Sequence, residues 1–206
     1  GLGVAASVVG LTLGLCVFLA YGTTASVARR LGAGDRPGAL AGGLDGITLG
    51  VGVGVVVAAV VGGLASPIVG LYQVSPEVAA PAGAYLGVVA LGFPAALAIL
   101  AATGVLRGLQ DTRTPLLVVV CMNLLNIALN LGLVFGLGWG IVGAATGTVV
   151  SQYLAAAWLV AAVLRGARRE QVRWRWRPAG VLAAASSSGW LILRTLGLQA
   201  ALLTTT

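Results

Sequence analysis

Long apolar stretches, separated by loops whose positive charges are all arginine, constrain the fold of this chain more than any other feature. The 206 residues are 59% hydrophobic and only 8% charged, whereas about a quarter of the residues in a typical soluble domain are charged. Several stretches exceed the roughly 18 residues at which an apolar run indicates a membrane-spanning helix. The sequence therefore predicts an all-α integral membrane protein, folded as a polytopic helical bundle.

The apolar stretches predict five complete transmembrane helices and the start of a sixth. The five cover about 2–28, 39–72, 78–106, 115–135 and 141–164, and the last helix begins near Gly189. The chain thus divides into five spans in 1–164, a basic linker in 165–188 and the start of a further helix in 189–206. Pro94 lies inside the third span, where it should kink the helix and free a carbonyl for a neighbouring helix to satisfy.

The arginines predict which side of the membrane each loop faces. Eleven of the twelve lie in alternate loops, at 29–37, 107–114 and 165–178. The twelfth, Arg194, fits the same side if it lies in the first turn of the last helix. The positive-inside rule places these loops in the cytoplasm. Because the chain begins and ends within apolar runs and lacks a starting Met, we expect a piece of a longer protein, with at least one helix before it if that protein starts in the cytoplasm.

Composition argues against several other classes of function. The net charge of +7 lies between spans rather than on a soluble face, so nucleic-acid binding is not expected. The alternating Arg-Trp run 173–177 directly follows a span, where Trp and Arg anchor a chain at the lipid interface. With no histidine, two cysteines inside apolar runs and five acids mostly in loops, the sequence predicts no metal site, no cofactor and no enzyme.

Three asparagines in the fourth span give the clearest indication of a functional site. Asn123, Asn126 and Asn130 stand at i, i+3 and i+7, so they share one helical face. Buried amides are costly unless they are hydrogen-bonded, so this face should look into the bundle or into a wet cavity. Candidate partners lie on the fifth and third spans: Thr146, Thr148, Ser151, Gln152 and Thr103. These residues fit two roles equally, as polar contacts between helices or as the lining of a substrate cavity.

Asp45 is the one acid well inside an apolar run. Counted from Pro37, it lies roughly 12 Å along its helix, at the interface or partly buried. An acid in a membrane span is a functional candidate. The favoured interpretation is nevertheless a salt bridge to one of the loop arginines, Arg29, Arg30 or Arg36.

The glycine cluster Gly50, Gly52 and Gly54 superficially resembles a phosphate-binding loop. No strand precedes it, and it lies within an apolar helix. The cluster is therefore interpreted as small residues that let helices approach closely.

Several segments resemble the multidrug and toxic compound extrusion (MATE) transporters. The run 104–116, GVLRGLQDTRTPL, resembles the loop that joins helices four and five of that family, and the likeness continues through 126–130 and 140–148. The run 21–35, YGTTASVARRLGAGD, is similar to the end of helix two in the DNA-damage-inducible (DinF-like) branch. The resemblance covers nearly the whole chain and implies family helices two to six plus the start of seven, an incomplete N-terminal lobe.

The resemblance also implies a function. The family exports bulky, often cationic or amphipathic compounds in exchange for H+ or Na+, by alternating access between two lobes. The resemblance to DinF-like members implies a first-lobe cavity formed by three groups. These are an acid on helix one, an Asn-x-x-x-Asp motif on helix five and a threonine on helix six. Asn126 matches the amide and Thr148 the threonine, but Asn130 stands where the acid is expected. Since an amide cannot exchange a proton near neutral pH, three explanations stay open: an acid in the missing helix one, coupling to Na+, or coupling elsewhere.

The sequence is thus interpreted as part of a secondary active multidrug efflux transporter in a bacterial-type cytoplasmic membrane. Expected partners are drug-like small molecules, the lipid bilayer, and the missing helix one and C-terminal lobe. Asn126, Asn130 and Thr148 should line the substrate or cation cavity, with Asn123, Thr103 and Gln152 at its margin. Two alternatives remain. The first is a lipid-linked oligosaccharide flippase of the same superfamily, which needs basic residues in the cavity. The second is a non-transporting membrane scaffold, in which the asparagine face would be closed off by another helix.

Overall fold

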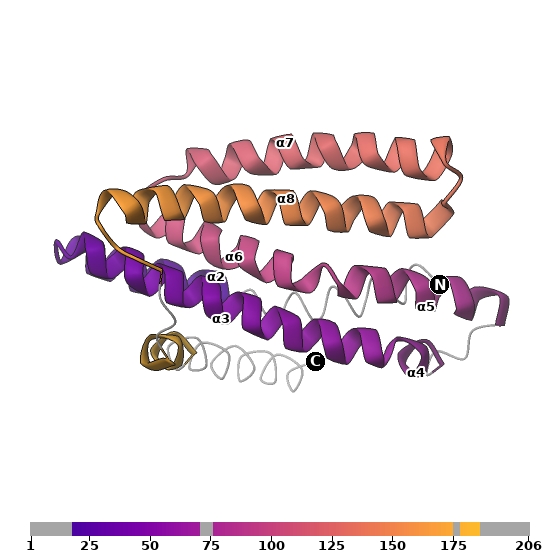
Figure 1. Ribbon diagram of the computed structural model, residues 1–206, viewed down its shortest axis with the longest axis horizontal. Helices are drawn as coiled ribbons and strands as arrows, with labels where there is room; N and C mark the ends of the chain where they lie inside the picture. Colours follow the sequence, from indigo (N-terminus) through magenta and orange to yellow (C-terminus); the bar gives the residue numbers. More distant parts are fainter. Residues whose placement is uncertain (1–17, 71–75, 175–177, 186–206) are drawn as a thin grey trace, which may run out of the picture.

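The computed structural model describes residues 18–70, 76–174 and 178–185, and within these ranges the chain contains helices and no β-strand (Figure 1). The helices are α2 (Phe18–Gly32), α3 (Arg36–Gly63), α4 (Ala65–Gly70), α5 (Pro76–Ala90), α6 (Phe93–Gly108), α7 (Arg113–Asn130), the π-helix η1 (Leu131–Gly136) and α8 (Gly140–Arg169). A further helical segment covers 178–185. The predicted all-α class is confirmed.

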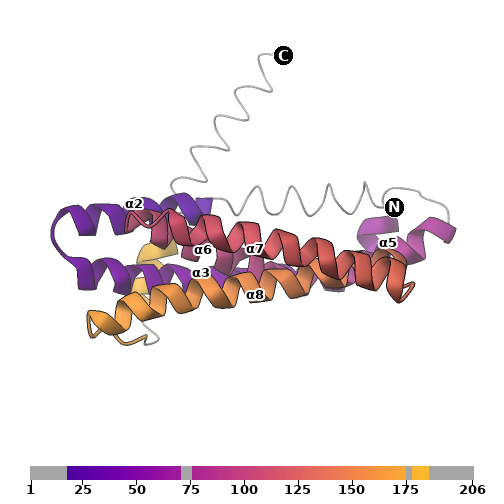
Figure 2. The ribbon, with the colours of Figure 1, turned by 90° about the horizontal axis from the view of Figure 1, so that it is seen from above.

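Three of the described helices are long and apolar enough to cross a membrane: α3, α7 continued by η1, and α8. The bent pair of α5 and α6 makes a fourth if it forms one span. The predicted first span is described only from Phe18 onward, as α2, and the predicted helix from Gly189 lies outside the described residues. The long helices run side by side along the molecule, as expected for a polytopic bundle (Figures 1 and 2).

Helix α6 lies at the centre of the bundle, with α2 and α3 on one side and α8 on the other. Apolar side chains from these four helices form the main core, including Val27, Leu40, Val105 and Leu159. Helix α7 packs mainly on α8 and buries only Pro115 and Val118 along its own length. Its outer face exposes apolar side chains, as expected of a helix that contacts lipid.

Glycines determine how closely some of these helices approach. A Cβ atom added to Gly54 of α3 would lie 2.5 Å from Cα of Pro94 in α6, and one added to Gly108 of α6 would lie 2.8 Å from Cβ of Val27 in α2. Gly50 is buried as well, whereas Gly52 faces open space. The prediction that glycines serve close helix contact is confirmed at Gly54 and does not extend to Gly52.

The predicted kink at Pro94 is confirmed, and it takes the form of a break. Helix α5 ends at Ala90 and α6 begins at Phe93, with a bend of 42° between them. Pro94 occupies the first turn of α6, where backbone N–H groups have no partner within the helix, so proline costs no helical hydrogen bond there. The hydroxyl of Tyr153 on α8 donates to the carbonyl of Leu91 at 2.9 Å. A neighbouring helix therefore satisfies a carbonyl within the break.

The second predicted span, 39–72, is not a single helix in the structure. Helix α3 ends at Gly63, and the separate six-residue helix α4 follows. Pro67 explains this boundary, because proline has no N–H for the carbonyl of Gly63 and its ring would clash with that carbonyl. At its other end, α3 begins where Asp35 caps it, since Oδ1 of Asp35 accepts a hydrogen bond from the N–H of Gly38 at 2.8 Å.

Helix α8 continues to Arg169, beyond the predicted end of the fifth span at 164. At ~1.5 Å per residue it is about 45 Å long, which exceeds the ~30 Å thickness of the hydrocarbon core. The first arginines of the predicted linker, Arg165, Arg168 and Arg169, therefore lie on the helix. The chain leaves regular helix at Glu170.

Helices α2, α6 and α8 end in the same kind of turn, on the arginine-rich side of the bundle. In each turn a backbone N–H donates to the carbonyl five residues earlier: Asp35 to Arg30, Asp111 to Leu106, and Val172 to Ala167. The preceding residue has a positive φ in all three cases: Gly34, Gln110 and Gln171. These are Schellman endings, which satisfy the last helical carbonyls. In the first two turns the aspartate then caps the next helix.

Candidate functional site

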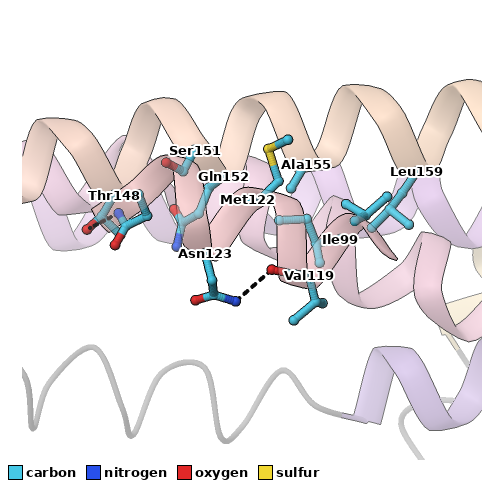
Figure 3. A pocket seen from close by; sticks show the side chains of 11 residues that line it. Ile99, Val119, Met122, Asn123, Thr148, Ser151, Gln152, Ala155 and Leu159 are labelled. Carbon is cyan, nitrogen blue, oxygen red and sulfur yellow. Dashed lines mark hydrogen bonds between the residues drawn. The ribbon is translucent and has the colours of Figure 1, made fainter. Parts of the chain in front are cut away.

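A cavity of about 250 Å³ lies between α6, α7 and α8 (Figure 3). Polar side chains of two helices line it: Asn123 and Asn126 on α7, and Thr148, Ser151 and Gln152 on α8. Apolar side chains complete the lining: Ile99, Val118, Val119, Met122, Ala155 and Leu159. An apolar wall with a few hydrogen-bonding groups and no charge can hold an apolar or amphipathic group and fix its orientation.

Helical periodicity explains why these residues face one another. On α7, Val118, Met122 and Asn126 are four residues apart, so they lie on one face. On α8 the lining positions are 148, 151, 152, 155 and 159, again a single face. Because α7 and α8 pack along their lengths, the two faces enclose the cavity, and Ile99 of α6 lines a further wall.

A chain of hydrogen bonds crosses from α7 to α8 beside the cavity. Nδ2 of Asn130 donates to Oδ1 of Asn126 at 3.1 Å, and Nδ2 of Asn126 donates to Oγ1 of Thr148 at 3.3 Å. The hydroxyl of Thr148 in turn donates to the carbonyl of Ala144 at 2.9 Å. The structure therefore brings together Asn126, Asn130 and Thr148, the three residues that the sequence predicts to line the cavity, although only Asn126 and Thr148 line it.

Asn130 lies one turn beyond the cavity lining, towards η1. Its Oδ1 is buried and accepts no hydrogen bond from the residues that the structure describes. A Cβ atom added to Gly147 of α8 would lie 2.7 Å from this oxygen, so the amide packs directly on the α8 backbone. A buried acceptor without a partner costs about 1–3 kcal/mol. A donor group or a cation that reached this oxygen would recover that energy.

The other polar lining residues have different surroundings. Asn123 is exposed, and its Nδ2 donates to the carbonyl of Val119 in its own helix at 2.7 Å. Ser151 is buried, and its hydroxyl donates to the carbonyl of Gly147 at 2.8 Å. Gln152 reaches past the cavity, because its Oε1 lies where a side chain on Gly92 would be. Gln152 therefore contacts the break between α5 and α6 while lining the cavity.

Three further candidates from the sequence lie away from the cavity. Thr103 is on α6 and does not line it. Thr146 does not line it either, and its hydroxyl donates to the carbonyl of Val142 at 2.8 Å. Asp45 of α3 is buried, with 4% of its surface exposed, and belongs to a different part of the bundle. Of the loop arginines expected near Asp45, Arg36 pairs with Glu170 at 3.0 Å and Arg30 donates to the carbonyl of Gly38 at 2.9 Å.

The apolar half of the cavity was not predicted from the sequence. Val118 and Met122 precede Asn126 by eight and four residues, so the periodicity that grouped the asparagines also marks these two. Ile99 carried no such signal, because its place in the lining depends on how α6 packs against α7 and α8.

Comparison with known proteins gives a consistent result. The MatE family model matches residues 1–132. Multidrug resistance protein PmpM of Pseudomonas aeruginosa is 35% identical over 162 residues, covering 75% of this chain and 34% of PmpM. DNA damage-inducible protein F of Escherichia coli is 35% identical over 186 residues, covering 86% of this chain and 40% of that protein. This second match confirms the resemblance to the DinF-like branch.

Solved structures agree on the fold. A crystal structure described as MATE in complex with MaD3S superposes with a TM-score of 0.80 at 23% identity, covering 97% of this chain and 47% of that one. At this identity the likeness concerns the fold alone. In each of these comparisons the chain spans less than half the length of the protein it matches.

Proposed function

This chain belongs to the MatE family, and from this premise we propose that it forms most of the first lobe of a secondary active multidrug efflux transporter. One observation above all supports the proposal. It is the uncharged cavity between α6, α7 and α8, whose lining includes the hydrogen-bonded pair of Asn126 and Thr148. In this proposal the protein lies in a cytoplasmic membrane, with loops 29–37 and 107–114 and the segment 165–178 on the cytoplasmic side.

The cavity suits amphipathic substrates. Met122, Leu159 and their apolar neighbours offer a flexible apolar surface, and methionine in particular adapts to ligands of different shape. Asn126 and Thr148 offer hydrogen bonds at one end of this surface. We propose that a substrate places its apolar part against α6 and its polar group beside Asn126. Attraction for cationic substrates would come from charged groups in the parts of the transporter that lie outside this chain.

Coupling to inward H+ or Na+ is part of the same proposal. The buried Oδ1 of Asn130 is an oxygen of the kind that ligates Na+. The amide nitrogen of the same side chain donates a hydrogen bond to Asn126. Because an amide does not exchange protons near neutral pH, coupling to H+ would use a carboxylate outside the described cavity. We propose family helix one as the position of that carboxylate, in line with the family resemblance.

The two alternative functions receive less support. A flippase for lipid-linked oligosaccharides needs basic residues to meet a pyrophosphate, and the lining of the described cavity has none. A scaffold role would need the asparagine face to be sealed and every amide satisfied. The cavity beside Asn126 and the unpaired oxygen of Asn130 both favour transport instead.

A matched pair of threonines tests the proposal in the full-length transporter. Thr148 and Thr146 both donate to the carbonyl four residues earlier on α8, but only Thr148 lines the cavity and accepts from Asn126. Thr148→Val should raise the KM for efflux of a fluorescent cationic dye roughly 5- to 10-fold, the effect of about 1–1.5 kcal/mol. Thr146→Val should leave the KM within about twofold.

Replacing the amides gives a stronger version of the test. Asn126→Leu together with Asn130→Leu should abolish drug export while the protein still inserts into the membrane at normal levels. Retained drug resistance in this double variant, or equal effects of the two threonine variants, would rule out the cavity assignment.

A further inference from the structure

The chain that follows α8 turns back and runs along α3. Gln171 has a φ of 57°, and the next residue, Val172, donates its N–H to the carbonyl of Ala167 at 2.8 Å. This ending reverses the chain, and Val172 then packs against the main apolar core. In Figure 1 the chain leaves the end of α8 towards α3, and the short helical segment 178–185 lies below α3 in that view.

Polar contacts attach this segment to α3 at two points. Oε1 of Glu170 pairs with Nε of Arg36 at 3.0 Å. Further along α3, Nε1 of Trp174 donates to Oγ1 of Thr48 at 3.0 Å, and that hydroxyl donates to the carbonyl of Leu44 at 2.9 Å. Arg36 and Thr48 lie about 18 Å apart along the helix axis and roughly a third of a turn apart around it, so the segment passes obliquely over α3. The segment therefore follows α3 for several turns instead of leaving directly into solvent.

The buried acid Asp45 marks the end of this contact. Its side chain packs directly on Gly180 of the segment 178–185, because a Cβ atom added to Gly180 would lie 2.6 Å from Cγ of Asp45. A side chain at position 180 would clash with this carboxyl group, so glycine lets the segment pack against Asp45. The acid that stands out in the sequence is thus covered by the chain that follows α8, and 4% of its surface remains exposed.

The length of α3 places this contact near the membrane surface. Its 28 residues give about 42 Å at ~1.5 Å per residue, roughly 12 Å more than the ~30 Å hydrocarbon core. If the excess lies at the arginine-bearing end, Asp45 and Thr48 fall close to the interface between lipid and water. Trp174 is half-exposed there, at the depth that tryptophan prefers.

We propose that residues 170–174 and 178–185 form a strap that stays docked on α3 during transport. This inference rests on the proposed function, because the strap would hold the point from which the chain continues into the second lobe. Three separate contacts hold it, at Arg36, Thr48 and Asp45. If the strap stays docked, the hinge between the two lobes lies after residue 185. The start of the second lobe then moves together with α3.

A disulfide tests the strap in the full-length protein in native membranes. In a background with Cys16 and Cys121 replaced by alanine, Asp45→Cys with Gly180→Cys brings two Cβ atoms to roughly the 3.5–4.5 Å that a disulfide spans. We expect the bond to form in most molecules, to the same extent at rest and during active efflux. A bond that fails to form, or that forms only when transport is stopped, would overturn the proposal. As a second reporter that leaves Asp45 intact, a short bismaleimide should join Thr48→Cys to Trp174→Cys.

A pair of tryptophan variants separates docking from general packing. Adding Trp174→Phe to the Asp45/Gly180 cysteine pair removes the indole N–H that bonds Thr48, and should slow disulfide formation about fivefold, the effect of one hydrogen bond. Trp158→Phe, an equally half-exposed tryptophan on α8, should leave the rate unchanged. Equal rates in the two variants would contradict the strap. The readout does not need transport, so a docked strap in a protein that exports nothing would refute the proposed function alone.

Discussion

Gln110 adopts a left-handed backbone conformation, with a φ of 66°, in the turn after α6. The corresponding residue in the turn after α2 is Gly34, with a φ of 78°. Both turns make the same two backbone hydrogen bonds. A Cβ atom in this conformation meets the following carbonyl and costs about 1–2 kcal/mol, which glycine avoids. The same turn thus occurs once with a favourable residue and once with an unfavourable one.

Exchanging these residue types should change stability in opposite directions. Gln110→Gly is expected to raise the free energy of unfolding by about 0.5–1 kcal/mol, and Gly34→Ala to lower it by about 1 kcal/mol. Gly32→Ala is the control, because a Cβ atom meets open space at both glycines and only Gly34 has a positive φ. Thermal unfolding of the purified protein in detergent ranks the variants. If Gly34→Ala matched Gly32→Ala, backbone conformation would not be the cause.

Asp111 links the stability of the α6–α7 turn to pH. Partial burial by itself raises the pKa of this carboxyl, but hydrogen bonds from the hydroxyl and N–H of Thr114, with the N–H and positive charge of Arg113, outweigh it and hold the pKa below its ordinary value. The two Thr114 bonds measure 2.6 and 3.0 Å. A folded-state pKa below the unfolded one means that the carboxylate stabilises the fold above pH ~3.9, and that this is lost as pH falls through the folded-state value.

Asp111→Asn should therefore lower the Tm at pH 5–7 but matter progressively less below about pH 4. The measurement is the Tm of both proteins in detergent across this pH range. A difference between them that stayed constant down to pH 3 would show that the charge of Asp111 does not contribute.

At the scale of helices, the break between α5 and α6 is held from two sides. Gly54 of α3 fits against the backbone of Pro94, and Tyr153 of α8 bonds the carbonyl of Leu91. Pro94 alone predicted that the third span would bend, because a missing N–H acts within its own helix. The identity of the two neighbours could not be predicted, because it depends on how three helices pack.

A large side chain at position 54 should disturb the contact between α3 and the start of α6. Gly54→Leu is expected to destabilise the protein by about 1–3 kcal/mol, the usual cost of overpacking a close contact. Gly52→Leu, two residues away on the same helix, adds the same atoms where nothing lies within 4 Å and should have little effect. Thermal unfolding compares them, and similar losses in both variants would argue against a specific α3–α6 contact.

For the molecule as a whole, the arginine-bearing turns gather at one end of the bundle. The α2–α3 turn, the α6–α7 turn and the end of α8 lie together, while the turn from η1 into α8 lies at the opposite end (Figure 1). This arrangement agrees with the alternation of arginine-rich and arginine-free loops along the chain.

Cysteine labelling in the full-length protein tests whether the two ends of the bundle face opposite sides of the membrane. With Cys16 and Cys121 replaced, a membrane-impermeant maleimide should label Leu137→Cys in intact cells and Gln171→Cys only after the membrane is opened. Both residues are exposed, so access is not limited by packing. Labelling of both positions from the same side would overturn the topology.

The helical class, most helix positions and the shared face of the asparagines could be predicted from the sequence alone. Each of these follows from interactions within a single helix or with the bilayer: a span must satisfy its own backbone hydrogen bonds, proline removes one, and residues four apart face the same way. The end of α3 at Gly63 also has a local cause in Pro67, although the predicted span continued to 72.

Which helical faces meet became known only from the folded arrangement of the helices. This arrangement joins Asn126 to Thr148 across two helices and places Trp174 on Thr48, 126 residues earlier in the chain. It also packs Oδ1 of Asn130 against Gly147, without a hydrogen-bond donor among the described residues. Such contacts depend on how closely helices approach, which is set by the side chains of both partners together. In a chain whose spans are all rich in small apolar residues, no single span specifies its neighbour.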